Sequence, residues 1–170
     1  MSELSRLHEA ITTTIKAAMP QFETVGSYTT VQQDTALPAL FHTITSLKPS
    51  TDPGDGHSCI LATFEARIAV DGHRPQAALE SAELAAQLMV VLRKQYWGID
   101  FVEEAHTLQA LPQATDLPTA TWVLQWQQVL HLGEAQWHWP NQPPGSLVFA
   151  FDPDSGPGKE GGYKAPEDFA

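Results

Sequence analysis

The segment CILATFEARIAV (59–70) constrains the fold more than any other part of the chain. Its even-numbered residues are all apolar: Ile60, Ala62, Phe64, Ala66, Ile68 and Val70. The odd-numbered residues from 61 to 67 are Leu61, Thr63, Glu65 and Arg67, three of which are polar. Successive side chains of a strand point to opposite faces, so this alternation predicts a strand with one buried and one partly polar face. An antiparallel sheet covered on one side requires such a strand.

A helix is predicted over residues 3–19, where apolar residues recur at steps of three and four. The stripe consists of Leu4, Leu7, Ile11, Ile15 and Ala18. Ser2 can cap the start of this helix and Pro20 can end it.

A second helix is predicted over residues 75–97, with an alanine-rich face. Pro75 suits the first helical position, Arg93 and Lys94 favour the last turn, and Gly98 suits a left-handed stop. The predicted apolar face comprises Leu79, Ala82, Ala85, Ala86, Met89, Leu92 and Tyr96. The alanines indicate close approach to a sheet or another helix.

Four further extended segments complete the expected fold. They are residues 22–32, 38–48, 100–111 and 121–132, with the turn DPGDG at 52–56 and a turn-like loop before the last segment. In the last segment, Trp122, Leu124, Trp126, Leu130 and Leu132 alternate onto one face. The predicted order is therefore α-β-β-β-α-β-β, an α+β fold in which two helices cover one face of a mainly antiparallel sheet.

The composition changes after Gly133, where proline, glycine and aromatic residues dominate. We predict a core domain over residues 1–133 and an extended C-terminal arm over 134–170. The arm carries the aromatic residues Trp137, Trp139, Phe149, Phe151, Tyr163 and Phe169. Exposed aromatics on such a segment call for a packing partner, either the parent domain or a neighbouring subunit.

The chain is acidic, with 9 Lys+Arg against 20 Asp+Glu and a formal net charge of -11. This balance excludes nucleic-acid binding through a basic surface and argues against binding to an anionic membrane. No Lys or Arg occurs between Lys94 and Lys159. Asp100, Glu103 and Glu104 lie in this interval, either as ordinary solvated acids or as a surface that repels passing DNA.

The sequence predicts no signal peptide, no membrane span and no disulfide. No apolar run is long enough for a signal peptide or a membrane span. The single cysteine, Cys59, excludes an internal disulfide. We expect a protein that stays where it is made.

Four candidate sites for chemistry are rejected on residue types, spacing or a missing motif. The stretch DPDSGPGKEGGY (152–163) has aspartates at Asp152 and Asp154 but lacks the glycine and final glutamate of a calcium loop. His131, Glu134 and His138 do not have an established zinc spacing. His57 lies near Cys59, but no motif marks a base or an oxyanion site. DPGDG lacks the lysine of a phosphate-binding loop. We therefore expect no catalytic residue, no metal and no cofactor.

Several stretches together resemble a family of small proteins from the tail-gene clusters of Mu-like phages and prophages. They are PALF (38–41), DPGDG (52–56), FEARI (64–68), WGIDFVEEA (97–105) and PPGSLVFAFDPDSGPGKEGGY (143–163). The chain is thereby similar, over nearly its full length, to the tail terminator (tail completion) proteins of long-tailed bacteriophages. The assignment rests partly on the order of helices and strands, which is an analogy of fold.

The resemblance implies a structural virion protein without catalytic turnover. Tail terminators form a ring, usually a hexamer, on the head-proximal end of the tail tube. The ring stops tube growth and presents a docking surface to the connector or neck proteins, and DNA passes through its lumen without specific binding. The expected partners are thus further copies of the chain, the tail tube protein and the connector, first in the host cytoplasm and then in the virion.

Three other functions remain open from the sequence. One is a different virion component, such as a head-completion or baseplate-associated protein. The others are a cytoplasmic enzyme with an unrecognised site and a monomeric binding module. Ring stoichiometry, a pocket with converging titratable groups, and the effect of deleting the arm distinguish these functions.

Overall fold

A computed structural model describes residues 2–51, 54, 56–134 and 158–166. The chain divides into two units, residues 1–136 and 137–170. The predicted boundary between residues 133 and 134 lies close to this division. In the second unit the described residues include a short 3-10 helix, η1 (Glu160–Gly162).

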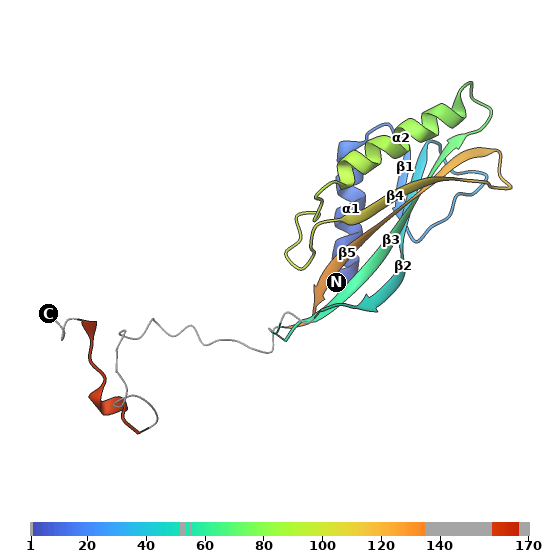
Figure 1. The fold of residues 1–170 in the computed structure, drawn as a ribbon. Coiled ribbons are helices and arrows are strands. Elements are labelled where there is room, and N and C mark those ends of the chain that lie inside the picture. The colour runs from blue at the N-terminus through green and yellow to red at the C-terminus, as the bar shows by residue number, and fades with distance from the viewer. Residues whose placement is uncertain (1, 52–53, 55, 135–157, 167–170) are drawn as a thin grey trace. The chain divides into compact units, whose positions relative to one another are not determined.

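The first unit has the predicted order α-β-β-β-α-β-β and the predicted α+β fold (Figure 1). Its elements are α1 (Glu3–Ala18), β1 (Thr24–Ser27), β2 (Ala39–Pro49), β3 (Ser58–Asp71), α2 (Ala77–Leu92), β4 (His106–Gln113) and β5 (Thr119–Leu132). The five strands form one sheet in the order β1-β2-β3-β5-β4. Only β1 and β2 pair in parallel, and the other neighbours are antiparallel.

Helices α1 and α2 pack against the face of the sheet that carries the even-numbered residues of β3 and β5. Five of the six predicted positions of β3 are fully buried in the core, and Ile60 is half-buried. In β5, Leu124, Trp126 and Leu130 are fully buried, while Trp122 and Leu132 are half-buried. The alternation prediction is confirmed, because one cluster joins these side chains to Leu7, Ile11 and Ile15 of α1 and to Leu84, Leu88 and Leu92 of α2.

The start of α1 agrees with the prediction, but its end differs by one residue. The Ser2 hydroxyl accepts a hydrogen bond from the Ser5 N–H at 3.2 Å, which caps the helix. The predicted apolar residue Ala18 is exposed, whereas Met19 is buried. The helix ends at Ala18, and the changed backbone direction at Met19 turns its side chain into the core.

Helix α2 is shorter than predicted and buries a different face. It spans Ala77–Leu92, so Pro75, Arg93 and Lys94 lie outside it. Lys94, four residues before the predicted stop at Gly98, already has φ 56°. The buried residues are Ala77, Ser81, Leu84, Ala85, Leu88 and Leu92. Two residues of the predicted face, Leu79 and Tyr96, are 54% and 52% exposed. The helix is apolar on most sides, so contact with the sheet, rather than the sequence pattern, selects its buried face.

The strand predicted over residues 100–111 begins only at His106. Residues 93–105 form a loop that pairs with β5 through a single bridge between Val102 and Leu130. Phe101, Val102 and Ala105 are buried in this loop, which explains why the sequence resembles a strand. A positive φ at Thr107 and a register shift between His106 and Gln109 separate the loop from the regular part of β4.

Candidate functional site

The predicted acidic residues Asp100, Glu103 and Glu104 lie on the loop of residues 93–105, here called the acidic loop. All three are exposed. The same loop begins with the exposed cations Arg93 and Lys94, at its opposite end in sequence. Asp100, Glu103 and Glu104 thus follow the change of chain direction at Gly98 (φ 66°), in the half of the loop that approaches β5.

Backbone hydrogen bonds fix the acidic loop against β5. The Glu103 N–H donates to the Val129 carbonyl at 2.9 Å, and the His131 N–H donates to the Phe101 carbonyl at 2.8 Å. The Ala105 N–H donates to the Gln95 carbonyl at 2.9 Å and closes the loop on itself. Because the loop's carbonyl and amide groups are used in this way, its carboxylates project from an ordered backbone.

A buried glutamine, Gln128 of β5, provides the strongest anchor. Its side-chain oxygen accepts the indole N–H groups of Trp97 (2.7 Å) and Trp126 (3.0 Å). Its side-chain nitrogen donates to the carbonyls of Gln95 (2.9 Å) and Glu103 (2.8 Å). Both N–H groups and the oxygen of this fully buried amide are therefore hydrogen-bonded. These bonds attach the acidic loop to the core.

The sequence reasoning missed Gln128, although a signal was present. Gln128 occupies an even-numbered position of β5 between Trp126 and Leu130, where the alternation requires a core residue. A polar residue at such a position indicates a buried hydrogen-bonding network. The two nearby tryptophans each supply an N–H that needs a partner when buried.

Beside the acidic loop, three side chains form a row that the sequence reasoning did not predict. The Cys59 sulfur lies 3.1 Å from His131 Nδ1, and His131 Nε2 lies 2.8 Å from Glu103 Oε1. Cys59 and His131 are direct partners in the β3–β5 register. The sequence instead placed His57 with Cys59 and grouped His131 with Glu134 and His138. His138 lies outside the described residues.

A second group of titratable residues is buried between α1 and β2. His8 Nδ1 lies 3.3 Å from His42 Nδ1, His8 Nε2 lies 3.1 Å from the Tyr28 hydroxyl, and the Thr12 hydroxyl lies 2.9 Å from His42 Nε2. Burial, together with the nearby His8, lowers the pKa of His42 to about 4. Burial also lowers the pKa of His8 below 6.5. Both rings are therefore neutral at pH 7, and each has one N–H to donate.

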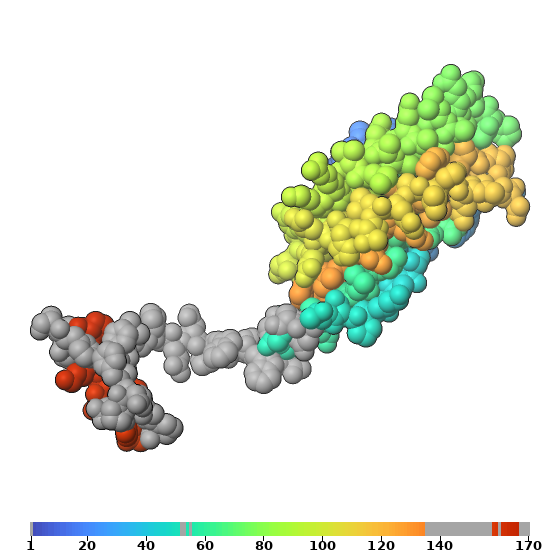
Figure 2. Space-filling view, in the orientation of Figure 1, coloured from blue at the N-terminus to red at the C-terminus, as the bar shows by residue number. Residues whose placement is uncertain are grey.

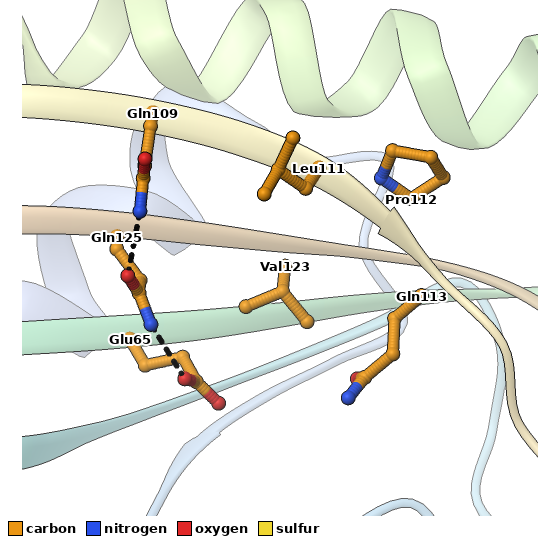
Figure 3. A pocket seen from close by; sticks show the side chains of 7 residues that line it. All are labelled: Glu65, Gln109, Leu111, Pro112, Gln113, Val123 and Gln125. Atoms are coloured by element: carbon orange, nitrogen blue, oxygen red, sulfur yellow. Dashed lines mark hydrogen bonds between the residues drawn. The ribbon is translucent and has the colours of Figure 1, made fainter.

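The sheet face opposite the helices carries a shallow hollow of about 260 Å³ (Figure 3). Leu111 and Val123 stand beside each other at its centre, on β4 and β5. A polar row crosses three strands at one side. Gln109 Nε2 donates to Gln125 Oε1 at 2.8 Å, and Gln125 Nε2 donates to Glu65 Oε2 at 3.1 Å. The hollow combines an apolar centre with a fixed polar border.

Most of the predicted arm residues lie outside the described part of the chain. These are Trp137, Trp139, Phe149, Phe151 and Phe169, and the rejected calcium-loop positions Asp152 and Asp154 lie outside it as well. Tyr163 belongs to the second unit, where it is half-buried. Within the described ranges, no group of three or more His, Cys, Asp or Glu side chains could hold a metal ion. No helix among these residues is long and apolar enough to cross a membrane.

Comparison with known proteins shows a shared fold and names no activity. No family model matches the chain, and no curated protein matches it. Chains of solved structures do match, 25 in number. One of them aligns with 77% of this chain and 94% of its own length, at a TM-score of 0.50 and 13% sequence identity. Its name states no activity, and at this identity the match shows a shared fold alone.

Proposed function

We propose that this protein is a phage tail terminator, a structural protein that forms a ring on the head-proximal end of the tail tube. The proposal begins with the resemblance of the five sequence stretches described above. In this role it needs no catalytic turnover. Its partners are further copies of the chain, the tail tube protein and the connector or neck proteins, and its location is the virion after assembly in the host cytoplasm.

One structural observation carries the proposal, namely that the domain has two different surfaces with exposed apolar residues on opposite sides. The first is the outer face of α2, a helix that lies at the molecular surface in Figure 2. Leu79, Ala86 and Val90 recur on this face at helical spacing and are exposed. The second is the helix-free sheet face around Leu111 and Val123. A closed ring of identical subunits needs two such unlike surfaces, because each subunit contacts its neighbours head to tail.

The two surfaces are also matched in kind. Leu79 is 54% exposed and Val90 is 75% exposed, and side chains of this size suit a shallow hollow with an apolar centre. Arg67 on the helix-free sheet face is already paired with Glu65 at 2.9 Å, so the match between the two surfaces rests on their apolar side chains.

The acidic loop fits the second demand on a terminator ring, which is that DNA passes without binding. Its three carboxylates are exposed and held on an ordered backbone. A fixed negative surface repels phosphate groups more effectively than a mobile one, because its charges cannot move away from the approaching strand. We propose that Asp100, Glu103 and Glu104 face the lumen.

A complementation experiment tests the head-to-tail contact. Val90→Asp disables one surface and Leu111→Asp disables the other, and each variant alone is expected to remain folded and fail to form rings. Mixed in equal amounts, they are expected to form heterodimers, since the intact sheet face of the first variant meets the intact helix face of the second. Mass measurement by light scattering detects the product. The control Lys16→Asp, also on an exposed helical position, should leave assembly unchanged.

A truncation tests the predicted arm separately. A chain that ends at Gly133 keeps all seven major elements of the first unit, so it is expected to fold and to assemble poorly. Circular dichroism measures folding, and light scattering measures assembly. A truncated chain that does not fold would place the arm's aromatics in the core. One that folds and forms normal rings would show that the arm has another role.

A further inference from the structure

The row formed by Cys59, His131 and Glu103 has a chemistry that ring formation does not use. The Cys59 sulfur lies 3.1 Å from His131 Nδ1, and His131 Nε2 lies 2.8 Å from Glu103 Oε1. Cys59 is 8% exposed, whereas the side chains of His131 and Glu103 are 26% and 53% exposed. A thiol, an imidazole and a carboxylate therefore lie in line from the interior to the surface.

The carboxylate at the end of the row determines which nitrogen of the imidazole carries the proton. An ionised carboxylate only accepts hydrogen bonds, so His131 Nε2 must be the N–H that donates to Glu103. In the neutral imidazole, Nδ1 then holds a lone pair and faces the Cys59 sulfur. The thiol consequently donates to Nδ1, which is the arrangement of a nucleophile and its base, with the base oriented by a third group.

All three residues are placed by fixed parts of the fold. Cys59 and His131 face each other on the central strand pair, and the backbone N–H of Glu103 is bonded to Val129. A hollow of about 500 Å³ adjoins His131, and it is lined by the charged or titratable residues Glu3, Arg6, His57 and Asp100. The hollow therefore opens the surface beside the imidazole to small solutes.

We propose that Cys59 is a covalent modification site for small sulfur electrophiles, that is, low-molecular-weight disulfides and thiosulfonates. In the reaction the proton of the thiol passes to His131 Nδ1, and the thiolate attacks one sulfur of the reagent. A new disulfide forms between Cys59 and that sulfur, and the reagent's S–S bond breaks. The electron pair leaves with the departing group, a thiolate or a sulfinate. Burial of Cys59 restricts the reaction to small reagents.

Methyl methanethiosulfonate is a suitable probe, because it is small and its products are defined. The thiolate takes up the methylthio group, and methanesulfinate departs. Mass spectrometry of samples quenched at intervals gives the rate, and the signal belongs to Cys59 because the chain has only one cysteine. The experiment uses the full-length chain from pH 6 to pH 9. It compares the native protein with the variants H131Q and E103Q and with a short unstructured cysteine peptide.

Below pH 8.5 the rate of the peptide should rise about tenfold per pH unit, because only its small thiolate fraction reacts. The native protein is expected to react with a much flatter pH profile. At pH 7 the variant H131Q should react about three- to tenfold more slowly and regain the peptide's profile. E103Q should fall between the two, since a carboxamide does not force the same tautomer.

Three results would overturn the proposal. They are a native pH profile as steep as that of the peptide, an H131Q rate equal to or above the native rate, and a cysteine that reacts only after denaturation. E103Q serves as the second test if H131Q does not fold, because Glu103 is the more exposed partner, and an unchanged rate and profile in E103Q would also count against the proposal. The modification site does not depend on ring formation, so either proposal can fail alone.

Discussion

Replacing Gln128 with alanine is expected to lower the free energy of unfolding by about 3–5 kcal/mol, the largest effect of any single change proposed for this protein. The substitution removes four hydrogen bonds at once. Two indole N–H groups and the Glu103 carbonyl then lose this partner inside the protein, whereas the Gln95 carbonyl keeps the Ala105 N–H. Each group left without a partner costs about 1–3 kcal/mol when it stays buried. Water that enters the vacated space offsets part of this cost. Chemical denaturation at pH 7 measures the difference.

Gln127→Ala is the matched control, because it removes the same side chain from the neighbouring, half-buried position. Its expected cost is below about 1 kcal/mol. Hydrogen exchange adds a local test. In Gln128→Ala, the amides of Glu103 and Ala105 should lose protection before those of β3, since the acidic loop loses its anchor to the core. If Gln128→Ala costs no more than Gln127→Ala, the loop is held by its backbone bonds alone.

Acidification from pH 6.5 to pH 4 is expected to destabilise the protein by about 3 kcal/mol through His42 alone. Its pKa is lowered from 6.5 to about 4, and each tenfold change in an acid constant corresponds to about 1.4 kcal/mol. In this pH window the unfolded chain binds a proton that the folded chain excludes, so stability falls as the pH falls. Only when the pH is well below 4 do both states carry the proton fully, and His42 then causes no further loss of stability.

The hydrogen bonds around His42 explain why protonation of its ring is unfavourable in the folded protein. With both rings neutral, one Nδ1–H donates across the 3.3 Å contact and the outer nitrogens pair with Tyr28 and Thr12. A first extra proton buries a charge, and a second sets two N–H groups against each other. Asp71 acts below this window, because hydrogen bonds from the His73 backbone and side chain lower its pKa from 3.8.

Urea denaturation at a series of pH values measures the effect. His42→Gln should be less stable than the native protein at pH 7 and should lose most of the decline between pH 6.5 and pH 4. His106→Gln, at an exposed position, is the control and should keep the native decline. A decline of equal size in native protein and His42→Gln would show that other groups are responsible.

The order of elements could be predicted because β3 and β5 show an alternating pattern and α1 shows an apolar stripe. The buried face of α2 could not be predicted, since a helix that is apolar on most sides does not indicate which face will contact the sheet. Residues 100–105 resemble a strand because Phe101, Val102 and Ala105 are buried, yet they form a loop. Contacts between residues far apart in the chain could not be predicted from the sequence either. His8 meets His42 across 34 positions, and Cys59 meets His131 only through the β3–β5 register.

A capping assay tests whether the protein caps a growing tail tube. Purified protein is added to the tail tube protein of the same phage during polymerisation, and the products are imaged by electron microscopy. We expect short tubes that carry one extra ring at a single end, with tube length falling as more protein is added. The Val90→Asp variant should have no such effect. Tubes of unchanged length without density at their ends, in the presence of excess folded protein, would show that the protein is not a tail terminator.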